Sequence, residues 1–127
     1  MSETTLRRAG WVLSALFGLF MLAASVAPKV FTDIGAQTMA GLGWPDAPVL
    51  LIGVLELACT LLFLIPRTGL LGATLMMAIL GGAMATQIRA HSPLFSHTLF
   101  SVWLGAVMWA GLWLRDPALR RLWPIRR

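Results

Sequence analysis

A chain of 127 residues has room for a single domain, and its composition is that of a membrane protein. Hydrophobic residues make up 58% of it and charged residues 12%, whereas soluble domains contain roughly a quarter charged residues. The net charge of +5 does not indicate nucleic-acid binding, because the basic residues lie at the ends of apolar runs. A single cysteine excludes an intrachain disulfide.

The chain opens with a polar leader over residues 1–8, followed by a predicted transmembrane helix over residues 9–27. A cleaved signal peptide is the alternative, but Pro28 would follow its cleavage site and the apolar run is long, so we favour an uncleaved helix. One face of this helix carries four small or polar residues, with the basic one at the outer end. They are Ser14, Gly18, Ser25 and Lys29.

Residues 28–46 form the longest connection between two predicted spans. A short helix at the membrane interface is expected there, with Asp33 and Gln37 facing water. Asp46 is expected to cap the helix that follows.

A second span is predicted over residues 47–65, where the apolar run stops at Pro66. Glu56 lies near its middle, and an ionised carboxylate at that depth costs roughly 2.5–3.5 kcal/mol on insertion scales. Gly53, Glu56 and Thr60 share one face of this helix, and most of its other residues are aliphatic. The acid is therefore expected to point into a helix bundle.

Two further spans are predicted over residues 68–86 and 98–114. The very short turn before the third span makes it an antiparallel neighbour of the second. Small residues four apart in the third span predict close helix contacts, as in the pairs Gly81/Ala85 and Gly82/Thr86. The predicted fold is all-α: a transmembrane four-helix up-down bundle, with a partly helical outer loop between spans one and two.

Lysine and arginine are divided unequally between the two sides that these spans define. The N-terminus, the turn between spans two and three and the C-terminal tail hold eight of them, and the other side holds only Lys29 and Arg89. This bias predicts cytoplasmic N- and C-termini, in what we expect to be a bacterial inner membrane.

Glu56 is the leading candidate functional residue. Three functional interpretations are open for it: a proton carrier, a general acid or base, and an anchor for a polar ligand group. The structural alternative is an acid that hydrogen-bonds Thr60 or pairs with Lys29 or Arg89. An outward-facing pocket around Glu56 would be lined by Lys29, Thr60, Gln87, Arg89 and His91. The competing interpretation is that Lys29 and Arg89 only extend to the lipid head groups.

No metal or haem site is predicted. His91 and His97 are six residues apart in a loop that contains Pro93, and no acid or cysteine stands beside them. Cys59 is interpreted as a small core residue, and the methionines of the third span as gap-filling side chains.

Several of these features occur in an order found in a known family. Lys29 follows span one, GLGWP precedes span two, GVLELACTLLFLIPR runs from Gly53 to Arg67, and ATQIR ends span three. Nearly the whole chain thus resembles the DoxX-like family of small four-span membrane proteins. That family is named after a subunit of a thiosulfate:quinone oxidoreductase. Its members often have His where Gln87 stands, and a neutral amide cannot carry a proton.

The leading functional hypothesis is an auxiliary or binding subunit that holds a lipid, a quinone or a partner helix around Glu56. Its expected contacts are the bilayer and a partner membrane protein or a second copy of the chain. The alternative is a quinone-linked oxidoreductase subunit in which Glu56 handles a proton. The third hypothesis is a small proton-coupled carrier. The lack of a broken helix among the predicted spans weakens this hypothesis. Whether the chain is an enzyme stays open. No cofactor is evident from the residues, and a quinone is the one candidate.

Overall fold

The computed structural model describes residues 1–126, all of whose regular elements are helices. The first helical segment is continuous and consists of α1 (Glu3–Phe20), a π-helical stretch (Met21–Val26) and α2 (Ala27–Val30). The remaining α-helices are α3 (Ile34–Gly41), α4 (Val49–Leu64), α5 (Gly69–Arg89), α6 (Phe100–Arg115) and α7 (Pro117–Leu122). A 3-10 turn (Pro66–Thr68) joins α4 to α5, and a π-helical turn (Leu94–Thr98) precedes α6.

Three helical segments are long and apolar enough to cross a membrane: Glu3–Val30, Pro66–Arg89 and Leu94–Arg115. The fourth apolar helix, α4, has only 16 residues. It is therefore about 24 Å long, against a hydrocarbon core of ~30 Å. The predicted all-α membrane fold is confirmed, while the fourth span and the up-down order stay predictions.

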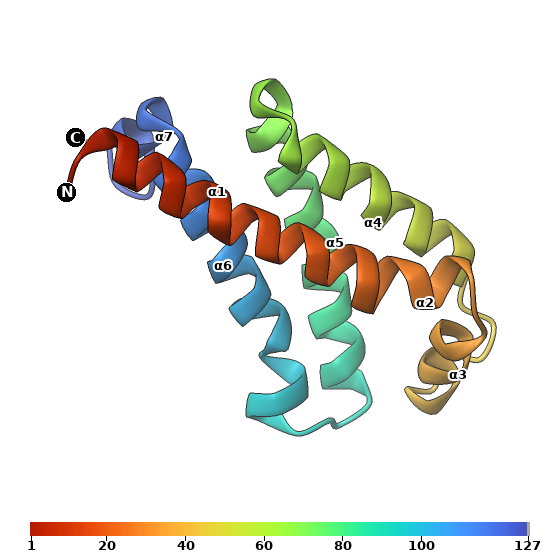
Figure 1. The fold of residues 1–127 in the computed structure, drawn as a ribbon. Helices are drawn as coiled ribbons and strands as arrows, with labels where there is room; N and C mark the ends of the chain where they lie inside the picture. The colour runs from red at the N-terminus through yellow and green to blue at the C-terminus, as the bar shows by residue number, and fades with distance from the viewer. Residues whose placement is uncertain (127) are drawn as a thin grey trace.

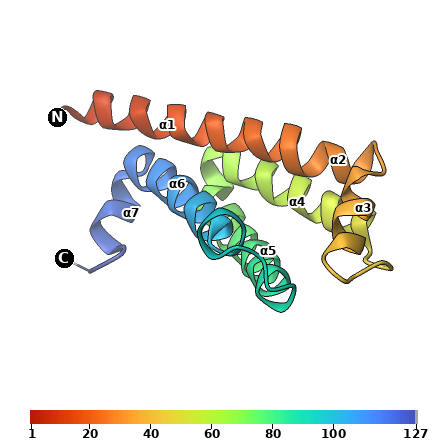
Figure 2. The ribbon, with the colours of Figure 1, turned by 90° about the horizontal axis from the view of Figure 1, so that it is seen from below.

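The long helices contact one another in a ring (Figure 1). α1 packs on α6, and its continuation through the π-helical stretch and α2 packs on α4. α4 packs on α5, and α5 packs on α6. Figure 2 shows α1 along one side of the molecule, with α4, α5 and α6 beneath it. The centre of the molecule is thus closed by helices from both ends of the sequence.

The hydrophobic core lies where these four helices meet. Phe17 and Phe63 pack edge to face with ring centroids 5.4 Å apart. Met76 and Met108 are fully buried beside them, and Cys59 belongs to the same core, as the sequence predicted. Flexible thioethers adapt to the irregular spaces of such a core.

Close helix contacts occur at glycines other than Gly81 and Gly82. A methyl group added to Gly72 in α5 would overlap the backbone of Phe63, so α5 and α4 touch through their backbones. By contrast, a methyl group at Gly81 or Gly82 would meet nothing within 4 Å. The prediction that these two glycines make close contacts is therefore wrong within this chain.

Two helix starts also differ from the sequence predictions. α1 begins at Glu3 because the Ser2 hydroxyl accepts a hydrogen bond from the Thr5 N–H at 3.2 Å. Most of the polar leader is therefore the first part of the same helix as the apolar run. Pro48 occupies the N-cap position of α4, and no side chain caps that helix. The predicted Asp46 cap is therefore wrong. The short α3 confirms that the loop between the first helical segment and α4 is partly helical.

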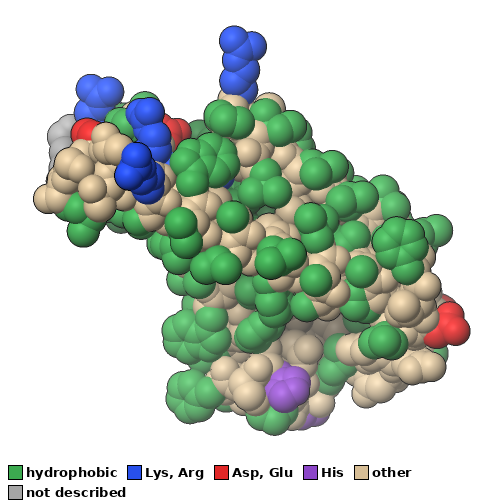
Figure 3. Space-filling model, viewed as in Figure 1, with side chains coloured by type: hydrophobic (Ala, Val, Ile, Leu, Met, Phe, Trp, Pro, Cys, Tyr) green, Lys and Arg blue, Asp and Glu red, His purple; other side chains and the backbone are tan. Residues whose placement is uncertain are grey.

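Charge is separated along the molecule (Figure 3). Lys and Arg side chains cover the two chain ends and project from the α4–α5 turn, while histidine lies over the α5–α6 connection. Hydrophobic side chains cover most of the face between them. Such an exposed apolar face fits contact with lipid rather than water.

Candidate functional site

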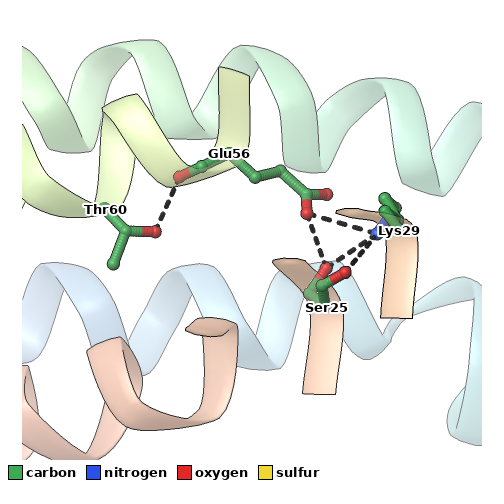
Figure 4. Close-up of polar contacts among 4 residues, drawn as sticks. All are labelled: Ser25, Lys29, Glu56 and Thr60. Carbon is green, nitrogen blue, oxygen red and sulfur yellow. Dashed lines mark hydrogen bonds and ion pairs between the residues drawn. The ribbon is translucent and has the colours of Figure 1, made fainter. Parts of the chain in front are cut away.

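Glu56 lies near the middle of α4 and is buried, with 6% of its surface exposed. It shares its buried face with Gly53 and Thr60, as their spacing predicted. The Thr60 hydroxyl donates to the backbone carbonyl of Glu56 at 2.7 Å, one turn earlier in the same helix. Thr60 therefore bonds the backbone of Glu56 and leaves the carboxylate to other partners (Figure 4).

Those partners come from the first helical segment. Oε2 of Glu56 accepts a hydrogen bond from Oγ of Ser25 at 2.8 Å and one from Nζ of Lys29 at 3.2 Å. Nζ of Lys29 also donates to Oγ of Ser25 at 2.9 Å and to the Ser25 carbonyl at 3.2 Å. These three residues form the Ser25–Lys29–Glu56 cluster, whose contacts converge in Figure 4. Of the two cations proposed to pair with Glu56, the structure selects Lys29.

A local change of helix type brings the two first-segment residues to α4. Ser25 lies inside the π-helical stretch Met21–Val26, and Lys29 follows it by four residues. A π turn is wider than an α turn, so it changes which later residues face a neighbouring helix, and such turns often occur at functional sites. Here both polar groups face Glu56 in α4.

Two glycines make room for the aliphatic stem of Lys29. A methyl group at Gly53 in α4 would lie 3.0 Å from Cβ of Lys29, and one at Gly35 in α3 would lie 2.9 Å from its Cγ. Both distances are shorter than ordinary van der Waals contact, so neither position admits a larger residue without movement. Gly53 and Glu56, one turn apart, therefore act together: the first admits Lys29 and the second binds it.

The cluster uses only half of the carboxylate. Among the described residues, Oε1 of Glu56 accepts no hydrogen bond, whereas Oε2 accepts two. When both groups are ionised, the pair carries no net charge, which lowers the cost of holding it away from water. One acceptor oxygen thus stays open in an otherwise satisfied buried pair.

The other residues proposed for a pocket around Glu56 lie elsewhere. Arg89 is exposed and lines a groove of about 220 Å³ between α5 and the segment after α3. The other groove residues are Leu42, Trp44, Ala85 and Thr86. No hydrogen bond or ion pair within residues 1–126 connects Arg89 to Glu56.

Gln87 and His91 do not join the cluster either. Oε1 of Gln87 is buried without a hydrogen-bond partner among the described residues. His91 is exposed just beyond α5 with a φ of 56°, and its backbone N–H donates to the Ile88 carbonyl at 3.1 Å. Its position is that of a helix-terminating residue. The expected polar pocket therefore does not form: Lys29 binds Glu56, Arg89 lines a separate groove, and Gln87 and His91 belong to neither.

Arg115 is a buried charged residue, which the sequence predictions counted only among the positive charges that indicate membrane orientation. It is 7% exposed, and its guanidinium lies 4.2 Å from the ring centroid of Trp11 and 4.5 Å from that of Phe63. It also donates to the Phe63 carbonyl near the end of α4. Gly10 and Gly69 leave the space that it occupies. Its place at the end of an apolar run gave no signal that it turns inward.

No group of three or more His, Cys, Asp or Glu side chains within residues 1–126 is arranged to hold a metal ion. The Ser25–Lys29–Glu56 cluster offers ionic and hydrogen-bonding contacts.

Comparison with known proteins agrees with this architecture. The model of the DoxX-like family matches residues 12–111, a range that includes the whole Ser25–Lys29–Glu56 cluster. No curated protein and no solved structure matches the chain. With three helical segments able to cross a bilayer, the chain is an integral membrane protein, and it belongs to the DoxX-like family.

Proposed function

We propose that this chain is an auxiliary, non-catalytic membrane subunit in which Glu56 anchors a polar group of a lipid, a quinone or a partner helix. One observation carries the proposal: Oε2 of Glu56 is held by Ser25 and Lys29, while Oε1 accepts no hydrogen bond from the described residues. A ligand hydroxyl or amide that donates to Oε1 would complete the site; among quinones this is the reduced quinol, whose hydroxyls donate, because the carbonyls of the oxidised form only accept. In a medium without water, such a bond selects a ligand that carries a donor.

The same geometry argues against repeated proton transfer. Each protonation of Glu56 would break its ion pair with Lys29 and disturb the hydrogen bonds that Ser25 and Lys29 donate to Oε2. A proton carrier also needs a second titrating group along its path, and position 87, near the end of α5, is an amide. Binding therefore uses the cluster as it stands, whereas acid–base chemistry would have to break it.

The proposed setting is a four-span bundle in a bacterial inner membrane, with both termini cytoplasmic. The ring of contacts in which α4 lies between the first segment and α5 supports α4 as the fourth span. A local thinning of the bilayer accommodates its short length. The arginines over the chain ends and the α4–α5 turn support the orientation (Figure 3).

Native mass spectrometry of gently solubilised protein, followed by organic extraction, tests the role of Glu56. The variants are Glu56→Gln and, as a matched control that also neutralises one acid, Asp33→Asn at an exposed site. We expect wild type and Asp33→Asn to retain one lipid or quinone species and Glu56→Gln to retain about tenfold less, the factor for a hydrogen bond to a charged group. All three should elute as the same folded species.

Each outcome of this experiment either identifies what Glu56 binds or contradicts its anchoring role. A second protein held by wild type but not by Glu56→Gln would identify the occupant as a partner helix. A quinone-dependent change in absorbance that requires Glu56 would favour the oxidoreductase alternative over the auxiliary subunit. Equal retention by wild type and Glu56→Gln would remove the anchoring role.

A further inference from the structure

A second site candidate lies at the opposite end of the first segment from Lys29. The first turns of α1 form a shallow depression of about 560 Å³. It is lined by Glu3, Thr4, Arg7, Arg8, Trp11 and Val12. None of these residues belongs to the Ser25–Lys29–Glu56 cluster, so the depression is independent of the function proposed for Glu56.

The depression is positively charged. Arg7 and Arg8 are exposed, and neither forms an ion pair with any residue in the part of the chain that the structure describes. Its one acid, Glu3, is already paired with Arg120, whose Nη2 lies 2.5 Å from Oε2 of Glu3. The guanidinium of Arg115 lies against the ring of Trp11 and adds a further positive charge nearby. The depression therefore favours an anion.

An apolar track continues from these charges along α1. Val12, Leu16 and Leu19 are exposed and lie on successive turns, following Arg8 at helical spacing. Trp11, between the charges and the track, has the amphipathic side chain that favours the interface between head groups and acyl chains. The surface thus offers a basic head and an apolar tail in the order in which a phospholipid presents its own groups.

We propose that this surface binds an anionic phospholipid of the cytoplasmic leaflet. Arg7 and Arg8 hold its phosphate, and an acyl chain lies along Val12, Leu16 and Leu19. Clusters of basic residues at the cytoplasmic end of a membrane helix attract anionic lipids, and arginine forms paired hydrogen bonds with phosphate. A free phosphate ion would leave the apolar track unused, and an acidic protein segment would cover it only with a matching apolar face.

Lipid titration of the purified full chain, read by native mass spectrometry, tests the site. The probes are phosphatidylglycerol and phosphatidylcholine, and the test variant is Arg7→Gln/Arg8→Gln. The control, Arg67→Gln/Arg121→Gln, also removes two exposed arginines of the same end but leaves the depression intact. All four residues are exposed, so the fold should be unchanged, which circular dichroism verifies.

We expect Arg7→Gln/Arg8→Gln to weaken phosphatidylglycerol binding about 30-fold, the factor for losing one hydrogen bond of ordinary strength from each arginine to the phosphate. The control should lose less than about threefold. Phosphatidylcholine carries the same phosphate, but its choline group cancels the net charge, so it should bind the wild type more weakly and lose less in Arg7→Gln/Arg8→Gln than phosphatidylglycerol does. Equal losses in the two double variants would show that only the overall charge matters and would overturn the site. Competition by inorganic phosphate, or binding of phosphatidylcholine as tight as that of phosphatidylglycerol, would overturn the lipid assignment.

Discussion

Replacing Lys29 with Met should destabilise the protein more than replacing Glu56 with Gln, although both changes break the same ion pair. Lys29→Met leaves a buried carboxylate that keeps only the hydrogen bond from Ser25. Removing one partner of a buried pair costs about 3–5 kcal/mol, and a lone charge within a membrane helix about 2.5–3.5 kcal/mol. We therefore expect a loss of about 3 kcal/mol in the free energy of unfolding.

Glu56→Gln should lose less, because the amide oxygen still accepts from Ser25 and Lys29. The Lys29 side chain is also 17% exposed, so its ammonium can move toward water on its flexible stem. The expected loss is about 1 kcal/mol, because the two hydrogen bonds that remain no longer end on a charged acceptor. The double variant should resemble Glu56→Gln, which gives a coupling free energy of about 2–3 kcal/mol.

The measurement is equilibrium unfolding in mixed micelles with increasing sodium dodecyl sulfate, followed by circular dichroism. Arg89→Met is the control, because Arg89 is exposed and forms no ion pair within residues 1–126. It should change the free energy of unfolding by less than about 0.5 kcal/mol. A coupling free energy below about 0.5 kcal/mol between Lys29 and Glu56 would refute the pair as a feature of the protein in lipid.

Three further predictions use the same unfolding measurement. Gly72→Ala should lower the free energy of unfolding by about 1–3 kcal/mol, because its methyl group overlaps the Phe63 backbone. Gly81→Ala, in open space, should be neutral or more stable, and equal effects of the two changes would contradict the packing. Arg115→Lys should lose about 1 kcal/mol, because an ammonium stacks less well on its two aromatic neighbours, and an unchanged value would mean that those contacts contribute nothing. His91→Gly should gain about 0.5 kcal/mol, since glycine adopts the positive φ without the steric cost of a side chain, and a loss would point to a role for the imidazole.

The helices and the face of the acid could be predicted from the sequence because both follow from local rules. Apolar runs long enough to cross a membrane predict helices, and a charged side chain in such a run must turn away from lipid. The spacing of Gly53, Glu56 and Thr60 then fixed the face of α4 that packs inward, and the structure places all three there.

The identity of the partner cation could not be predicted, because it depends on how helices cross. Lys29 and Arg89 both lie at the predicted outer ends of their helices. Counting residues along ideal α-helices places neither of them closer to Glu56 than the other. The π-helical stretch and the two glycines around the Lys29 stem decide between them, and the first of these has no clear sequence signature. Gln87 and His91 were grouped with Glu56 for the same reason, since a shared end of the bundle does not place side chains in contact.

The inward turn of Arg115 was missed because its burial depends on three helices at once. Its guanidinium needs the ring of Trp11 from α1, the carbonyl and ring of Phe63 from α4, and the space left by Gly69 in α5. No local pattern connects residues so far apart in the chain. The count of positive charges placed Arg115 at the same end of the bundle as the chain termini but gave no information about the direction of its side chain.

The shortness of α4 has a consequence for biosynthesis. Under the proposed four-span topology, a 16-residue helix that carries a carboxylate is a poor stop for the translocation machinery on its own. The 3-10 turn Pro66–Thr68 holds it against α5, which is longer and carries no acid, so the two would enter the bilayer together as a helical hairpin. Lys29 would already be in place when Glu56 arrives, and the first helical segment would act as the receiving surface that retains α4 during assembly.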